Sequence, residues 1–177
     1  MGCGYSSRQG LLWLIVLALV GGCTMRLSVC GLRPEYPEVL YSLTGTQVAF
    51  VWVDSLQPTL RWESFPRPQD READKEGILN RIGTVGYDLR IWRAENDYPA
   101  EMVYSRQGLP NASHTIEDPL EPSAKYFWTI RARFEIEGHP RVAEWGLSEH
   151  PWPLGPSPCK LGRIPIPNYY RFKTPPK

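Results

Sequence analysis

The sequence predicts an all-β protein, and three observations favour that class. Proline and glycine are frequent, with 18 and 15 of the 177 residues, so the chain is divided into many short segments. Seven tryptophans and nine tyrosines supply large side chains that pack well on pleated strands. Residues 125–137 alternate between apolar and polar side chains, which is the period of a strand with one face in the core.

The stretch from Lys125 to Glu137 carries the clearest strand pattern. We expect its core face to hold Tyr126, Trp128, Ile130, Ala132, Phe134 and Ile136. The side chains of the opposite face should be exposed to solvent, as in antiparallel sheets with one solvated side. That face holds Phe127, Thr129, Arg131, Arg133, Glu135 and Glu137.

The length of the chain indicates one domain with additional segments outside it. Shorter patterns predict the other strands of that domain. In chain order, the expected strands are Gln47–Val53, Pro58–Glu63, Tyr87–Arg93, Glu101–Ser105, Ser113–Glu117 and Tyr169–Thr174. Residues 64–86 and 138–168 are rich in glycine, proline and polar residues, so we expect long connections there. The first connection can hold a short helix around Glu72–Ile82.

The N-terminal segment predicts export from the cytoplasm. Arg8 precedes an unbroken apolar run, Leu11–Val20, that is too short to span a bilayer. The small residues Gly21 and Gly22 follow, and a short apolar run before small residues is typical of a secretory signal peptide. We therefore expect residues 1–22 to be a signal peptide.

The stretch Val20-Gly21-Gly22-Cys23 resembles the lipobox of bacterial lipoproteins. The resemblance implies that Cys23 becomes the first mature residue and carries palmitate-type acyl chains that hold the protein in a membrane. Thr24 then favours the outer membrane over the inner membrane. Two alternatives stay open. Cys23 could lie beside the cleavage site of a soluble secreted protein, or Met1-Gly2-Cys3 could be a eukaryotic myristoylation and palmitoylation start.

The remaining cysteines predict one disulfide. Cys3 leaves with the signal peptide and Cys23 takes the lipid, so Cys30 and Cys159 remain. An even remainder in an oxidising compartment favours a bond between them, and two separate thiols are the alternative. No spacing of cysteine and histidine supports a zinc site, and we expect no metal and no cofactor.

The order and content of the predicted strands resemble a fibronectin type III domain. Leu60-Arg61-Trp62 is similar to the second strand of that family, Tyr87–Ile91 to the third and Tyr126–Ala132 to the sixth. Phe172–Pro175 is similar to the closing strand of bacterial members. The stretch Leu120-Glu121-Pro122 before Tyr126 implies a tyrosine corner, in which the phenol bonds to the preceding turn.

This resemblance implies a fibronectin type III-like (immunoglobulin-like) β-sandwich at residues 47–177 with two long loop insertions. A lipidated N-terminus and tether would occupy residues 23–46. In that topology the insertions at 64–86 and 138–168 emerge at one pole, and the tether arrives beside them. A disulfide between Cys30 and Cys159 would then staple the tether across that pole.

Three aromatic residues near the late insertion are candidate ligand-binding residues: Trp145, Trp152 and Tyr169. Aromatic rings near proline-rich loops can stack on sugar rings or grip a peptide. The alternative is that they fill a small core of the insertion, because large aromatic side chains bury much area.

Charge and motifs exclude several function classes. The formal net charge of +1 falls to zero without Arg8, so the mature chain lacks the basic surface of a nucleic-acid-binding protein. The absence of GxSxG, HExxH, P-loop and GxGxxG motifs leaves no catalytic residue to expect. The sequence therefore predicts a membrane-anchored cell-envelope lipoprotein, a non-catalytic interaction or structural module with a protein or polysaccharide partner. The alternatives are a carbohydrate-binding accessory protein and a hydrolase with an unrecognised site.

Overall fold

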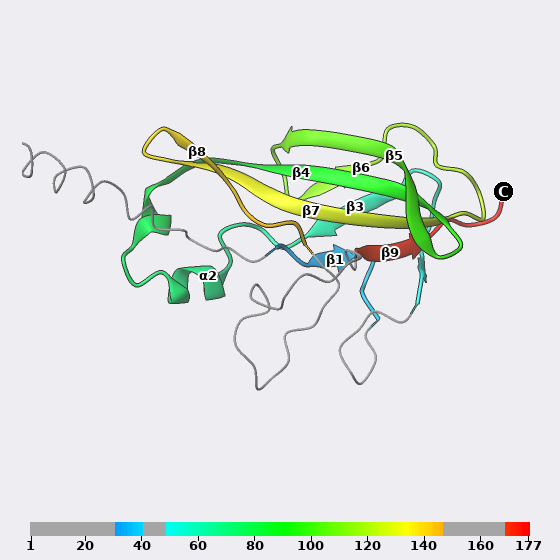
Figure 1. Cartoon of the computed structure of the whole chain (residues 1–177), viewed down its shortest axis with the longest axis horizontal. Coiled ribbons are helices and arrows are strands. Elements are labelled where there is room, and N and C mark those ends of the chain that lie inside the picture. The colour runs from blue at the N-terminus through cyan, green and yellow to red at the C-terminus, as the bar shows by residue number, and fades with distance from the viewer. Residues whose placement is uncertain (1–30, 41–48, 147–168) are drawn as a thin grey trace, which may run out of the picture.

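The computed structural model describes residues 31–40, 49–146 and 169–177, and this part of the chain is mostly β (Figure 1). A smaller sheet has the order β1-β3-β6, with β1 Pro34–Tyr36, β3 Thr59–Trp62 and β6 Ser113–Thr115. A larger sheet has the order β2-β9-β7-β4-β5, and β8 pairs with β7 beyond β9. Its strands are β2 Val51–Trp52, β4 Ile82–Glu95, β5 Tyr98–Leu109, β7 Lys125–Ile136, β8 His139–Val142 and β9 Tyr170–Lys173.

Both sheets contribute side chains to one hydrophobic core. Leu60 and Trp62 alternate with exposed neighbours along β3 and are buried. The Trp62 ring meets the Tyr87 ring of β4 edge to face, with the ring centroids 5.6 Å apart. One continuous cluster of buried residues joins the two sheets, so the fold is a two-layer all-β arrangement.

The pattern of β7 is confirmed on its core face, where all but the last of the expected residues are fully buried. The opposite face is not exposed to solvent along its whole length, because Phe127 and Thr129 are buried as well. Phe50 packs edge to face on Phe127, with the ring centroids 5.3 Å apart. The Thr129 hydroxyl donates a hydrogen bond to the Gly146 carbonyl at 2.6 Å. Segments distant in sequence therefore cover the first part of that face.

Some predicted elements are confirmed and others are corrected. The strands expected at Pro58–Glu63 and Tyr169–Thr174 are present as β3 and β9, while β4 and β5 are longer than expected. Of the stretch Gln47–Val53, only β2 is a strand in the described residues, and it runs parallel to β9. β1 and β8 were not expected, because short strands that contain proline carry no period-two pattern.

The helix expected around Glu72–Ile82 is wrong in position. An α-helix, α2, spans Pro68–Ala73, and a separate 3-10 helix spans Ile78–Arg81. Gly77 directly precedes the 3-10 helix at φ 67°, a left-handed conformation that glycine adopts without strain.

The two insertions begin at the same end of the molecule. Figure 1 shows α2 and β8 at one end, and the turn between β4 and β5 near the C-terminus at the other. We call the first end, residues 64–81 and 137–142, the insertion pole. The opposite end, residues 93–101 and 118–125, is the far pole.

Candidate functional site

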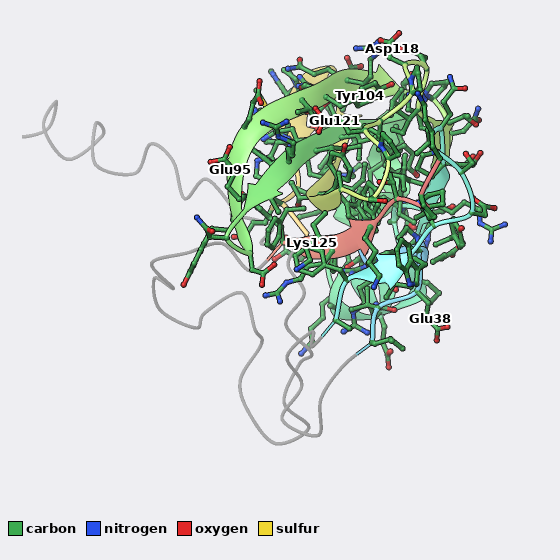
Figure 2. All side chains as sticks on the ribbon, turned by 90° about the vertical axis from the view of Figure 1, so that its right-hand side faces the viewer. Glu38, Glu95, Tyr104, Asp118, Glu121 and Lys125 are labelled. Carbon is green, nitrogen blue, oxygen red and sulfur yellow. The ribbon has the colours of Figure 1, made fainter. Side chains whose placement is uncertain are left out.

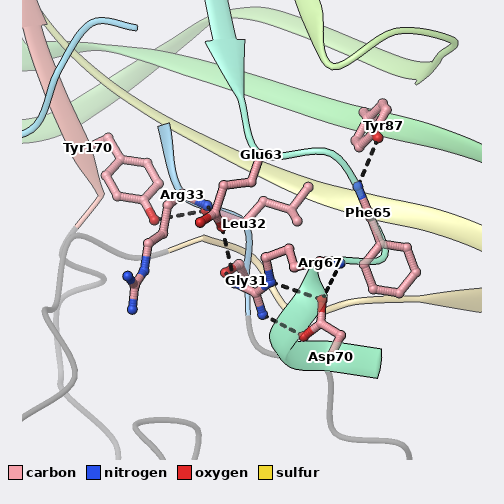
Figure 3. Close-up of polar contacts among 9 residues, drawn as sticks. All are labelled: Gly31, Leu32, Arg33, Glu63, Phe65, Arg67, Asp70, Tyr87 and Tyr170. Carbon is pink, nitrogen blue, oxygen red and sulfur yellow. Dashed lines mark hydrogen bonds and ion pairs between the residues drawn. The ribbon is translucent and has the colours of Figure 1, made fainter. Parts of the chain in front are cut away.

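The first described residues, 31–33, lie between the two insertions, and we call them the entry segment. Arg67 donates a hydrogen bond to the Gly31 carbonyl at 3.2 Å, and the Tyr170 hydroxyl donates one to the Leu32 carbonyl at 2.9 Å (Figure 3). A Cβ atom on Gly31 would lie 2.4 Å from the Cα of Gly146. The entry segment and the start of the late insertion therefore touch through their backbones, and no side chain fits between them.

Arg67 is the centre of a buried ionic network (Figure 3). The residue is only 6% exposed, and its guanidinium lies 2.8 Å from the Asp70 carboxylate and 3.2 Å from the Glu63 carboxylate. Glu63 also accepts the backbone N–H of Arg33 at 3.1 Å. Burial alone would lower the pKa of Arg67, but Asp70 and Glu63 outweigh it and hold the pKa above its ordinary value. One charged side chain thus links the entry segment to the first insertion.

The local sequence explains why α2 starts beside this network. Pro68 occupies the start of the helix, where its missing N–H costs nothing and its fixed φ is already helical. The Asp70 carboxylate accepts the backbone N–H of Arg67 at 2.9 Å as well as its guanidinium. Asp70 therefore satisfies a free donor at the helix N-terminus and neutralises the buried arginine with the same group.

A second buried charge lies on the outer face of the larger sheet. Asp88 of β4 is 1% exposed, and its carboxylate lies 2.9 Å from the guanidinium groups of both Arg131 and Arg133 on β7. It also accepts the Gly108 N–H of β5 at 3.2 Å. Burial alone would raise the pKa of Asp88, but these hydrogen bonds outweigh it and hold the pKa below its ordinary value. The carboxylate therefore joins three strands of the sheet.

Trp145 lies over the same outer face. The guanidinium carbons of Arg90 and Arg131 lie 4.5 and 4.3 Å from its ring centroid, within cation–π distance. The next residue, Gly146, donates its N–H to the Ile130 carbonyl at 2.8 Å. The late insertion is thus fastened along β7 both by its backbone and by this ring.

Tyr169 reaches the outer face from the other end of the late insertion. Its ring stacks on Trp92 of β4, with the centroids 4.6 Å apart and the planes 5° from parallel. Burial raises the pKa of Tyr169, and the charge of Arg90 opposes that rise. Arg90 therefore lies near both Trp145 and Tyr169, and the structure brings these two predicted residues to one face of one sheet.

The other predicted site residues lie outside the described residues. They are the lipid attachment residue Cys23, the disulfide candidates Cys30 and Cys159, and the aromatic candidate Trp152. Three residues of these clusters are not among the predicted site residues: Arg67, Arg90 and Trp92. A signal for Arg67 was present, since proline followed two residues later by an acidic residue marks a helix start. The partners of Arg90 and Trp92 lie far away in sequence, so no local pattern indicates them.

Within residues 31–40, 49–146 and 169–177, no group of three or more potential ligands could hold a metal ion. In the same ranges, no helix combines the length and the apolar character that a bilayer crossing requires. Comparisons with models of known protein families and with curated proteins found no match to this chain.

Proposed function

We propose that this chain is a membrane-anchored lipoprotein of the cell envelope, in which a fibronectin type III-like sandwich acts as a non-catalytic interaction or structural module. The strand order supports the sandwich, because β1-β3-β6 and β5-β4-β7-β9 divide the strands as in an immunoglobulin-like fold. The tyrosine corner gives further support. The Tyr126 hydroxyl accepts the backbone N–H of Glu121 at 3.0 Å, as the resemblance implies.

The observation that carries the proposal is the way the chain enters the fold. Gly31 is held by Arg67 of the first insertion and packs directly on Gly146 of the second. Cys23 precedes Gly31 by eight residues, and a chain of that length reaches at most ~29 Å. Acyl chains on Cys23 would therefore keep the entry segment within that distance of the membrane surface.

Bracing at the entry point suits an anchored module. A pull on the lipidated end acts first on the segment at Gly31–Arg33, which is tied to β3, α2 and β9 by hydrogen bonds. The entry segment then stays in place under load, and the module can present its surface to a protein or polysaccharide of the envelope. A chain serving only as a flexible spacer would not need such ties.

Carbohydrate binding through Trp145, Trp152 and Tyr169 has less support from the geometry. The Trp145 ring is engaged by two guanidinium groups of the chain itself, and one face of Tyr169 is covered by Trp92. Sugar rings stack on free aromatic faces. These two rings are therefore better suited to packing the late insertion on the larger sheet than to binding a sugar.

Metabolic labelling with an alkyne fatty acid in a Gram-negative host tests the anchor. We expect the full chain to take up label and to fractionate with the outer membrane on a density gradient. The Cys23→Ser variant should lose both properties, and Cys3→Ser should retain both because Cys3 leaves with the signal peptide.

Two results would overturn the anchor at Cys23. Label that persists in Cys23→Ser but disappears in Cys3→Ser would support acylation at the very N-terminus instead. A wild-type chain that is processed, unlabelled and soluble in the periplasm would support simple secretion.

A further inference from the structure

A polar concavity of about 270 Å³ opens on the solvent face of the smaller sheet. Its walls come from β1, β3 and the loop before β3, and they consist of Tyr36, Asp54, Ser55, Gln57, Thr59 and Arg61. β3 runs from Thr59 towards the first insertion, so this concavity lies at the end of the strand that points away from the insertion pole. None of these residues belongs to the outer face of the larger sheet.

Two opposite charges face this concavity without pairing. Asp54 and Arg61 both line it, and within the part of the chain that the structure describes neither forms an ion pair. The Arg61 guanidinium instead lies 5.5 Å from the ring centroid of Tyr36. Both residues are exposed, so each keeps hydrogen-bonding capacity for a ligand.

The walls of the concavity are held in place by their own hydrogen bonds. The Asp54 N–H donates to the Tyr36 hydroxyl at 3.3 Å, and the Gln57 N–H donates to the Ser55 hydroxyl at 2.9 Å. The Thr59 hydroxyl is 2.8 Å from the hydroxyl of Thr115 on β6. Gln57 also donates its side-chain amide to the Glu117 carbonyl. The loop before β3 is therefore tied to both neighbouring strands of the smaller sheet.

We infer that this concavity binds a neutral sugar residue of a polysaccharide. A carboxylate accepts from sugar hydroxyls, and a guanidinium donates to them. The opposite charges of Asp54 and Arg61 cancel, which favours neither an anionic nor a cationic ligand. The volume is just below the range of about 300–1,000 Å³ for drug-sized ligands, which suits one ring. The open mouth admits a residue within a longer chain.

Ligand-observed saturation-transfer NMR on the full mature chain in a sugar-free detergent tests the site. The probes are chitotriose, cellotriose and maltotriose, with the zwitterion glycylglycine as a competing class. At least one trisaccharide should give a signal. Asp54→Asn and Arg61→Gln should each weaken its affinity by about tenfold or more, because each removes a charged hydrogen-bond partner. Glu35→Gln is the matched control, since Glu35 is exposed on β1 but does not line the concavity, and it should bind as the wild type does.

Four results would overturn the inference. The first is a lack of signal from all three trisaccharides at millimolar concentration, and the second is unchanged affinity in both Asp54→Asn and Arg61→Gln. The third is a stronger signal from glycylglycine than from any sugar, and the fourth is binding that is lost in Trp145→Ala but kept in Asp54→Asn. The last result would move sugar binding to the outer face of the larger sheet. Circular dichroism of each variant confirms that the comparison is made between folded proteins. None of these outcomes depends on whether Cys23 carries lipid.

Discussion

The two poles of the molecule both place an arginine among carboxylates, but they differ in how much water reaches the charges. At the insertion pole, the Arg67 and Asp70 side chains are only 7% and 9% exposed. At the far pole, Arg93 is 33% exposed, and its partners Glu95, Glu101 and Glu121 are all more than 60% exposed. Figure 2, which faces the far pole, shows Glu95, Glu121 and Lys125 at the surface.

This difference decides what each network does for the protein. Water screens the pairs around Arg93, so they contribute little to the free energy of folding. Arg67 and Asp70 have already lost most of their hydration, so removing either one leaves the other as a buried charge without its closest partner. The poles therefore resemble one another in composition and differ in energetics, and the following experiments test that difference.

The largest expected effect comes from removing the two arginines in turn. Arg67→Ala should lower the free energy of unfolding by about 3–5 kcal/mol, because it strands Asp70 and Glu63. Arg93→Ala should leave the urea denaturation midpoint within experimental error. Urea titration of both variants beside the wild type measures the contrast, and equal losses at the two positions would refute it.

The second-largest effect on the free energy of unfolding is expected at Asp88, and it should depend on pH. Asp88→Asn should lower the free energy of unfolding by about 2–3 kcal/mol at pH 7, because two arginines lose a charged acceptor. Since the pKa of Asp88 is depressed in the folded state, its contribution is present above its ordinary pKa of about 4 and fades as the pH falls further. Denaturation from pH 2 to pH 7 measures this. Asp97→Asn removes an exposed partner of Lys125 and is the control, which should leave the free energy of unfolding at pH 7 unchanged.

Gly146→Ala should produce a smaller loss, where the late insertion packs on the entry segment. Its added Cβ would lie 2.4 Å from the Leu32 carbonyl oxygen, so the entry segment must shift, at a cost of about 2 kcal/mol. Gly83→Ala is the matched control, because the nearest atom to its Cβ would be 3.9 Å away. Thermal unfolding of the two variants compares them. A Gly146→Ala protein as stable as Gly83→Ala would mean that the entry segment is not packed tightly on the late insertion.

The smallest expected effect lies next to the far pole, at the tyrosine corner. Tyr126→Phe removes the bond from the Glu121 N–H but keeps the ring stacked on Phe172, so we expect a loss of about 1 kcal/mol. Tyr98→Phe changes an exposed phenol and should be neutral. Urea denaturation distinguishes the two, and a neutral Tyr126→Phe would show that this turn needs only the ring.

Features that depend on neighbouring residues in the chain could be predicted from the sequence. The alternation along β7, the pair Leu60 and Trp62 on β3 and the tyrosine corner at Tyr126 each depend on residues close together in the chain. The lipidation motif at Cys23 and the pairing of Cys30 with Cys159 remain predictions, because these residues lie outside the described residues.

The sequence by itself therefore determined the all-β class and the strands with a strong period, because a period of two is a local property of the backbone. Only the tertiary structure decided the rest. The Arg67 network joins Gly31 to Asp70, Trp145 meets Arg90, and Tyr36 meets Asp54 across the concavity. Each contact joins residues brought together by sheet pairing and loop packing, and a sequence pattern has no means to encode a neighbour at such a separation.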